Sequence, residues 1–435
     1  MHLQEGGVRI IVLGATGLIG SAVSARLGAD GHDVVGLSRS RGSPGLTAVR
    51  HMIFDIAGAT TAEQWFAILS GVDAVVNCAG VLQDSPSDST RGVHADGVAA
   101  LFEACERQGV RRIVHLSAAG VDRGSSAFSQ TKQAGDAALM ARDLDWFILR
   151  PSVVIGRGAY GGSALLRGLA ALPVRPVLPG TGPLQLVHLD DVVETVCVCL
   201  RGETPTGHIL ELVGRRRWSF DEAAQLFRRW LRWPAAPAVT VPSFMAGLLY
   251  RTGDALSWLG WRPPVRTTAQ REIVHGATGD AGRWRQLTGI VPRDIEHALA
   301  SEPASVQERW FAQLYLLKPL VFGVFGLFWI STGIVSLGPG WNDGLNLMRE
   351  GGARETLAIL TVVAGGLADI VIGLAILYRP TSRLGLYAAL AISIIYMIIG
   401  TLLLPRLWAD PLGSMLKVWP IMVLTLVALA IREDR

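Results

Sequence analysis

The stretch Arg9–Gly20 reads RIIVLGATGLIG and decides the fold of the first half of this 435-residue chain. Its first five residues predict a buried strand, which runs straight into glycines spaced as GxxGxxG, and a helical pattern follows over Ser21–Leu27. In such a loop Gly14 permits a tight turn, Gly17 lets the backbone approach a pyrophosphate, and Gly20 lets the helix pack close to the strand. The stretch predicts a dinucleotide-binding loop.

Short apolar segments alternate with helical patterns from residue 8 to about residue 150. This rhythm predicts an α/β fold, a doubly wound parallel sheet of the Rossmann type with helices on both faces. Between about 151 and 300, Gly- and Pro-rich loops and an amphipathic helix over Ser219–Leu231 indicate a smaller substrate-side lobe. After the first strand, further strands are predicted over Asp33–Leu37, His51–Phe54, Ala74–Asn77, Arg112–Leu116 and Trp146–Leu149.

Long apolar runs dominate from Leu320 onward, and only 17% of the whole chain is charged. A spanning helix needs roughly 20 apolar residues, so we expect an all-α transmembrane domain of four helices. The last span is the weakest, because Lys417 and Pro420 lie near its start, and a bundle of buried helices is the alternative. Asp369 is costly in lipid and should face the bundle interior or a polar cavity. The expected spans are Leu320–Leu337, Thr356–Tyr378, Leu384–Leu404 and Leu412–Ile431.

Loop charge predicts the orientation of these spans. The short connection between the second and third spans carries Arg379 and Arg383 without an acid, whereas the loop after the first span balances its charges. The positive-inside bias then places both termini and the nucleotide module in the cytoplasm. The N-terminus has no basic segment followed by an apolar run, so no signal peptide is expected. We expect a multi-pass protein of the inner (plasma) membrane.

Four parts are therefore expected: an NAD(P)-binding Rossmann core over 1–150, a substrate-side lobe with the remaining sheet elements over 151–300, a polar linker over 301–317 and a membrane domain over 318–435. The formal charge of +4 comes without a long basic run, which argues against nucleic acid as a partner. Four cysteines lack zinc-type spacing, so no metal site is expected.

The motifs that follow the strands resemble the short-chain dehydrogenase/reductase superfamily. Asn77–Gly80 (NCAG) comes after the fourth strand, and His115–Gly120 (HLSAAG), Phe128–Lys132 (FSQTK) and Arg150–Ser152 (RPS) follow in order. This order is similar to the atypical, extended branch, related to the NAD-dependent epimerase/dehydratase proteins, and the resemblance covers roughly residues 8–215. A nicotinamide dinucleotide is the cofactor that it implies.

The cofactor form is inferred from the end of the second strand, which reads Leu37-Ser38-Arg39-Ser40-Arg41. An NAD-preferring protein would place an acid there against the ribose hydroxyls, and none is present. Arg39 can pair with a 2′-phosphate, so NADP(H) is expected in preference to NAD(H); a solvated surface arginine is the alternative. Counting what the resemblance implies, the expected cofactor-binding residues are Gly14, Thr16, Gly17, Leu18, Ile19, Gly20, Arg39, Asp55, Ile56, Cys78, Ala79, Gly80, Ser117, Lys132, Pro151, Ser152 and Val153.

The catalytic slot departs from the family pattern. In the family a tyrosine passes a proton to or from the substrate oxygen, while a lysine four residues on lowers the tyrosine pKa and binds the nicotinamide ribose. Phe128 occupies the position of the tyrosine, and its phenyl ring can neither donate nor accept this proton. Ser117 and Lys132 are the remaining candidate catalytic residues, although a serine after a strand is as often a backbone cap.

Two further groups offer alternatives. Tyr160 lies on the expected substrate side and either replaces the missing phenol or is an ordinary loop residue. His188 with Asp190 and Asp191 suggests a base and its orienting acid, whereas in relatives this segment resembles a helix start that supports the sheet edge.

The C-terminal block, about 315–435, resembles the DoxX-like membrane family. Together these features suggest a membrane-tethered, NADPH-binding oxidoreductase acting on a lipid-soluble substrate such as a quinone or isoprenoid. Hydride transfer to a quinone does not strictly need the tyrosine, because the product oxygen can take its proton from water. The alternative is a non-catalytic NADPH-binding structural or assembly subunit of a membrane complex, similar to the accessory subunit of respiratory complex I. Whether the chain is an enzyme stays open at this point.

Overall fold

The computed structural model describes residues 7–39 and 49–432 and forms two compact units. The first unit comprises Met1–Asp254 and Pro263–Ala312, and the second comprises Ala255–Arg262 and Gln313–Arg435. Ser40 and Arg41 of the motif after the second strand lie outside the described residues.

The first unit is built on a seven-stranded sheet in the order β10-β6-β5-β4-β1-β2-β3, and every neighbouring pair is parallel. All six predicted strands lie in it. The seventh, β10, was not predicted individually. The order runs outward in opposite directions from β1 and β4, so the carboxyl ends of these two strands flank the crevice where ligands bind in such sheets. The strands are β1 Arg9–Leu13, β2 Asp33–Ser38, β3 Arg50–Ile53, β4 Ala74–Asn77, β5 Arg112–Leu116, β6 Asp145–Pro151 and β10 His208–Leu212.

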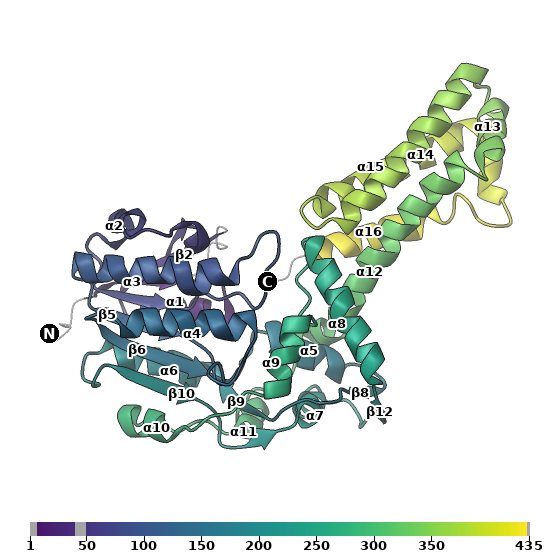
Figure 1. Cartoon of the computed structure of the whole chain (residues 1–435). Coiled ribbons are helices and arrows are strands. Elements are labelled where there is room, and N and C mark those ends of the chain that lie inside the picture. The colour runs from purple at the N-terminus through teal and green to yellow at the C-terminus, as the bar shows by residue number, and fades with distance from the viewer. Residues whose placement is uncertain (1–6, 40–48, 433–435) are drawn as a thin grey trace. The chain divides into compact units, whose positions relative to one another are not determined.

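Helices cover both faces of this sheet (Figure 1). One layer buries Trp284, whose indole N–H donates to Thr195 Oγ1 at 2.9 Å, and the other buries Trp65, which donates to Ala59 O at 3.1 Å. Burying a large apolar side chain contributes roughly 1.5–3 kcal/mol, and a partner for each indole N–H avoids the cost of an unpaired donor. The first layer holds α1 Leu18–Ala29, α6 Leu189–Leu200 and α10 Gly282–Thr288; the second holds α2 Glu63–Leu69, α3 Gly97–Gln108 and α4 Ala127–Met140.

Smaller elements complete the first unit. The amphipathic helix predicted over Ser219–Leu231 is α7, Phe220–Trp230, and the Ser219 hydroxyl and the Glu222 side chain form a capping box at its start. The other elements are strands β7 Val153–Ile155, β8 Arg175–Val177, β9 Leu184–His188, β11 Arg217–Trp218 and β12 Ala238–Thr240, and helices α5 Gly161–Ala170, α8 Ser243–Trp258, α9 Thr267–His275 and α11 Ile295–Ser301.

The expected linker over 301–317 is mostly helical instead. Helix α11 ends at Ser301 and α12 spans Val306–Leu337, 32 residues, so only 302–305 is irregular. At 1.5 Å per residue α12 is about 48 Å long, longer than the roughly 30 Å hydrocarbon core. Of the polar residues that suggested a linker, those from Gln307 on belong to the first turns of α12, which extend beyond the apolar run.

Among the residues that the structure describes, three helices are long and apolar enough to cross a membrane: α12, α14 (Glu355–Leu377) and α15 (Ser382–Leu403). The expected fourth span, Leu412–Ile431, is shorter than predicted, because α16 covers only Val418–Ile431 and its 14 residues reach about 21 Å. The polypeptide turns just before it, where Gly413 has φ +65° and Asp410 accepts from Leu412 N–H. A helix not predicted, α13 Trp341–Glu350, lies between α12 and α14.

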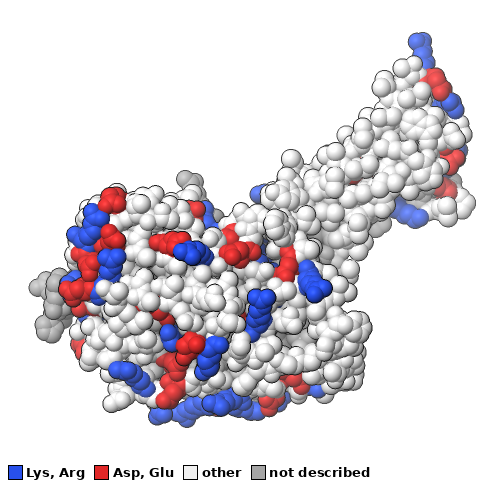
Figure 2. Space-filling view, viewed as in Figure 1, with Lys and Arg blue, Asp and Glu red and all other residues white. Residues whose placement is uncertain are grey.

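An apolar cluster joins these helices. Phe322, Phe325 and Trp329 of α12 meet buried side chains of α14, α15 and α16, so α16 packs in the bundle. Asp369 is 2% exposed and accepts from the Tyr396 hydroxyl at 3.2 Å, which places it in the interior as expected. Figure 2 shows long uncharged surfaces along these helices and charged residues at the end near α13.

Glycines let α12 and α14 approach backbone to backbone. A Cβ on Gly333 would collide with the Gly366 carbonyl oxygen, and one on Gly373 would lie 2.5 Å from the Gly326 carbonyl oxygen. Small residues of this kind allow close helix packing in membranes.

We expect Gly333→Leu to lower the stability of the second unit by about 1–3 kcal/mol, because the added side chain has no space between α12 and α14. Gly323→Leu on the same helix is the matched control, since nothing lies within 4 Å of its Cβ position. Thermal unfolding in detergent measures both. Equal melting temperatures for the two variants would contradict this packing.

Candidate functional site

The glycine-rich loop lies at the carboxyl end of β1. Gly14 has φ +71°, and the N–H groups of Gly14 and Ala15 donate to Leu37 O at 2.9 and 3.3 Å. Gly17 N–H donates to Gly14 O at 2.9 Å, and a Cβ on Gly20 would collide with that same carbonyl oxygen. Gly14 and Gly20 thus have the steric reasons that the sequence suggested. Thr16 lies in the loop, and Leu18 and Ile19 open α1.

Lys132 reaches this end of the sheet from α4. Its ammonium donates to Leu116 O at 2.8 Å and to Ala79 O at 3.3 Å, and the side chain is buried. Burial lowers the pKa of Lys132 to about 8. An ammonium has three N–H donors, so one remains for a ligand hydroxyl next to Gly80, whose Cβ position is 3.7 Å from the lysine Nζ.

His94 is a site residue that the sequence reasoning missed. Its Nε2 accepts from Val81 N–H at 2.9 Å, its Nδ1 lies 3.0 Å from Thr131 Oγ1, and its ring stands edge-on to Phe128 with centroids 5.5 Å apart. Burial, with the nearby Lys132 charge, lowers the pKa of His94 to about 2, so the ring is neutral. It sits in a single π-helical turn, Gly92–Asp96, a local geometry that no sequence pattern signalled.

Ser117 faces a buried polar network rather than open space. Its hydroxyl donates to Asp136 Oδ2 at 3.0 Å, and Arg150 donates to the same oxygen at 2.9 Å. His115 Nε2 lies 3.5 Å from Asp136 Oδ1, while its Nδ1 is 2.9 Å from Asn77 Nδ2. Burial by itself would raise the pKa of Asp136, but His115 and Arg150 outweigh it and hold that pKa below its usual value. The Ser117 proton is therefore committed to Asp136.

Phe128 occupies the first turn of α4 and is half-buried. Its neighbours Ser126 and Ser129 donate to the carboxylate of Glu272 on α9, with Ser129 Oγ at 2.9 Å. This contact connects α4 to the substrate-side lobe, and Glu272 was not expected from the sequence. The phenyl ring brings no hydroxyl to the slot.

Arg39, expected at a 2′-phosphate, is paired within the protein. Its guanidinium donates to Asp88 Oδ1 at 2.6 Å and to Ser87 O at 2.6 Å, and the Asp88 side chain is almost fully buried. Asp55 caps the short turn Ile56–Gly58 by accepting from Ala57 N–H at 3.2 Å.

The remaining expected residues join neighbouring strands. Cys78 N–H donates to Leu13 O at 3.0 Å, and Ala79 N–H donates to Asn77 Oδ1 at 3.1 Å. Pro151 O accepts from Ala119 N–H at 2.9 Å, and the Ser152 hydroxyl donates to Gln185 O, while Val153 starts β7. These residues hold the loops after β1, β4, β5 and β6 together.

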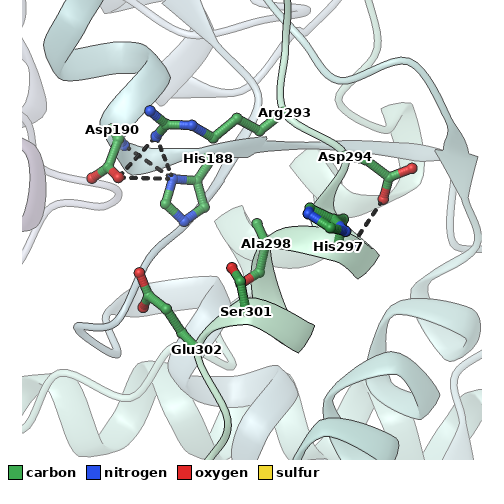
Figure 3. A pocket seen from close by; sticks show the side chains of 8 residues that line it. All are labelled: His188, Asp190, Arg293, Asp294, His297, Ala298, Ser301 and Glu302. Atoms are coloured by element: carbon green, nitrogen blue, oxygen red, sulfur yellow. Dashed lines mark hydrogen bonds and ion pairs between the residues drawn. The ribbon is translucent and has the colours of Figure 1, made fainter.

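The two alternative groups have different surroundings. Tyr160 is 39% exposed and precedes α5. His188 caps the start of α6, with its Nδ1 accepting from Asp190 N–H at 3.3 Å, and Arg293 pairs with Asp190 at 2.8 Å and Asp191 at 3.4 Å. Figure 3 shows His188, Asp190 and Arg293 at a pocket of ≈ 340 Å³. None of the expected cofactor-binding residues lines it, and its arginine is held by acids. His188, Asp190 and Asp191 therefore form the start of α6, and ion pairs connect this helix start to Arg293.

Two families match this chain. Residues 10–212 match the NAD dependent epimerase/dehydratase family, and residues 326–426 match the DoxX-like family. The chain therefore combines an epimerase/SDR-like Rossmann domain with a C-terminal DoxX-like membrane domain. Both resemblances drawn from the sequence are confirmed.

Curated relatives cover parts of the chain. An uncharacterized protein of Mycobacterium tuberculosis is 29% identical over 184 residues, 42% of this chain and 19% of that protein. The ceramide reductase of Caulobacter vibrioides is 29% identical over 150 residues, 34% of this chain and 47% of the relative. The chain thus spans less than half the length of these relatives. The 40 kDa subunit of the mitochondrial NADH-ubiquinone oxidoreductase of Neurospora crassa is 26% identical over 303 residues, 67% of this chain and 77% of the subunit.

Solved structures share the fold of the first unit. WbmG of Bordetella bronchiseptica in complex with NAD has a TM-score of 0.54 at 16% identity and covers 69% of this chain and 94% of its own. MoeE5 in complex with UDP-glucose and NAD has a TM-score of 0.52 at 19% identity, with 71% and 99% covered.

The lowered pKa of Lys132 predicts a pH dependence of stability. Its pKa is about 8 in the folded chain against an ordinary value of 10.5, so the folded state binds fewer protons than the unfolded state between these values. Stability contributed through this group therefore rises as the pH rises from about 8 to about 10.5. We expect the melting temperature of the wild type to rise relative to Lys132→Met across this window. A constant difference would show that the amine is not buried as described.

Proposed function

We propose that the glycine-rich loop, Lys132 and the loop after β4 bind a nicotinamide dinucleotide. The glycines support this, because a side chain at Gly14 would strike Ala79 and one at Gly17 would meet Gly14 O, where the pyrophosphate must approach. The start of α1 presents backbone N–H groups to that phosphate. Lys132 retains one N–H donor for the nicotinamide ribose after bonding two carbonyls.

We further propose that the chain is a membrane oxidoreductase whose acceptor is lipid-soluble, a quinone or an isoprenoid. The observation that carries this is a site in which Phe128 replaces the phenol and the Ser117 proton is committed to Asp136. A bound reduced nicotinamide supplies a hydride, and a quinone that accepts it needs only a proton from water to become the hydroquinone. The phenyl ring offers an apolar contact to such an acceptor.

The membrane domain and two relatives support the same substrate class. The DoxX-like helices tie the nucleotide domain to the bilayer, where such acceptors dissolve. One relative is by name a ceramide reductase, and another is by name a subunit of an NADH-ubiquinone oxidoreductase. A lipid-soluble acceptor suits all three facts.

The second candidate function is a nucleotide-holding subunit without turnover. It is favoured by the same two observations, because neither Phe128 nor Ser117 has a free proton for a substrate. In that case the dinucleotide would stabilise the first unit or its partner in a membrane complex.

Turnover in vesicles distinguishes the two candidates. The full chain, reconstituted with ubiquinone in the bilayer, should oxidise the reduced dinucleotide, and vesicles without ubiquinone should not. Lys132→Met should slow the reaction strongly at sub-saturating dinucleotide, and Arg111→Met, an exposed residue just before β5, should not. A dinucleotide that stays bound and reduced in all vesicles would favour the structural subunit.

For the cofactor form, we propose NADP(H) over NAD(H), with Asp88 as the residue that tunes this choice. Asp88 competes with a 2′-phosphate for the Arg39 guanidinium. Asp88→Asn should therefore strengthen NADPH binding relative to NADH, and Arg39→Ala should erase the preference. Fluorescence titration of both nucleotides measures this. Unchanged affinity ratios in both variants would exclude Arg39 from the binding site.

Restoring the phenol should restore carbonyl chemistry. We expect Phe128→Tyr to create or raise the reduction of simple carbonyl compounds, because the Lys132 ammonium lies one helical turn away and can lower the pKa of a phenol. Phe128→Leu is the control for a change of shape. Equal rates in the wild type and in Phe128→Tyr would mean that another group already supplies the proton.

A further inference from the structure

Helix α8, Ser243–Trp258, has one face packed against the protein. Ala246, Tyr250 and Ser257 are buried along it, and a Cβ on Gly253 would collide with the Val265 carbonyl oxygen. These positions repeat every three or four residues, as one side of a helix does. One side of α8 is therefore buried.

The other face of α8 is apolar and uncovered. Phe244 is 75% exposed, Leu248 is 62% exposed and Trp258 is 73% exposed, and Met245 and Leu249 lie beside them. Large apolar side chains in one exposed stripe are rare on soluble proteins and mark a surface that another phase or molecule covers.

The residues that follow α8 are attached to an end of the membrane helices. Trp261 packs against Phe322 of α12 with ring centroids 4.7 Å apart, and its indole N–H donates to Leu377 O at 2.8 Å. Leu377 is the last residue of α14, and Arg379 N–H in the next turn donates to Leu259 O at 2.9 Å. Tryptophan and arginine at the end of a span lie at the lipid headgroups. The end of α8 is therefore held at the membrane surface.

We propose that α8 lies in the plane of the membrane surface, with the stripe of Phe244, Met245, Leu248, Leu249 and Trp258 in the lipid. Only Leu259 and Gly260 separate Trp258 from Trp261, so the stripe leads directly into the segment that packs against the apolar helices α12 and α14. The exposed Arg251 lies on the same face, between Leu248 and Trp258, and a long basic side chain in such a position reaches the lipid headgroups while its methylenes stay in the apolar layer. The lipid is thus the occupant that both the chain connection and the composition favour.

The packed face of α8 connects this surface to the proposed nucleotide site. Gln83, three residues after Gly80, donates to Asp254 Oδ1 of α8 at 2.8 Å. This inference does not rest on the proposed function, since a structural subunit would use the same contact.

Lipid-quenching fluorescence tests the proposal on the full chain in vesicles. An environment-sensitive dye is attached to L248C, and the vesicles contain phospholipid with a quencher near the headgroup. Met140→Cys on α4, also an exposed apolar position, is the matched control, and the unmodified chain corrects for labelling of native cysteines. We expect quenching several-fold stronger at position 248 than at position 140.

Equal quenching at the two positions would overturn the proposal, and it would favour a second copy or a protein partner as the cover of α8. Adding Phe244→Glu to the L248C chain should reduce the quenching, whereas Gln130→Glu, an exposed polar position on α4, should leave it unchanged. Quenching that is insensitive to both changes would also contradict a lipid contact made by this stripe. Because L248C carries the main readout, the test does not depend on a disruptive variant folding.

Discussion

Buried charge at the carboxyl edge of the sheet constrains the whole proposed site. Lys132 is removed from water and gives two of its N–H groups to carbonyls of the loops after β4 and β5. Beneath it Asp136 is held by Arg150 and Ser117, and removing one partner of such a buried group typically costs about 3–5 kcal/mol. The loops cannot move without exposing or unpairing these charges, so the edge is rigid before any ligand arrives.

Because these side chains are held by other protein groups, the site is suited to binding a ligand and not to transferring a proton to it. The Ser117 hydroxyl donates its proton to Asp136, and the neutral His94 ring bonds Val81 N–H and the Thr131 hydroxyl. Phe128 adds only an apolar surface. A site of this kind can orient a dinucleotide and exclude water near it. It suits an acceptor that takes its proton from solvent, and for this reason we propose a membrane-dissolved quinone or isoprenoid.

Much of the fold was predictable from the periodicity of apolar residues and from the residue types in the loops. Apolar residues dominate β1, β4 and β5 and the middle of β2 and β6, and the glycine spacing specified the loop at Gly14, so both followed from local sequence. Tertiary contacts decided the elements that the sequence did not predict. Strand β10 was missed because its apolar run lies among loops, and the first turns of α12 were interpreted as a polar linker. The turn at Gly413 makes the last helix shorter than expected. In the site, Lys132 and Phe128 were identified from their spacing. The pairing of Arg39 with Asp88, and the roles of His94 and Glu272, depend on side chains far apart in sequence.

The central claim is that Lys132 holds the nicotinamide half of a dinucleotide at this edge. Affinities of the reduced dinucleotide and of ADP, measured for the wild type and for Lys132→Met, test it most directly, because ADP lacks the nicotinamide ribose. A hydrogen bond from a charged group is worth about 1.5–3 kcal/mol, so the substitution should weaken dinucleotide binding roughly 10- to 100-fold and leave ADP binding unchanged. Loss of affinity to the same extent for both ligands, or for neither, would contradict the account.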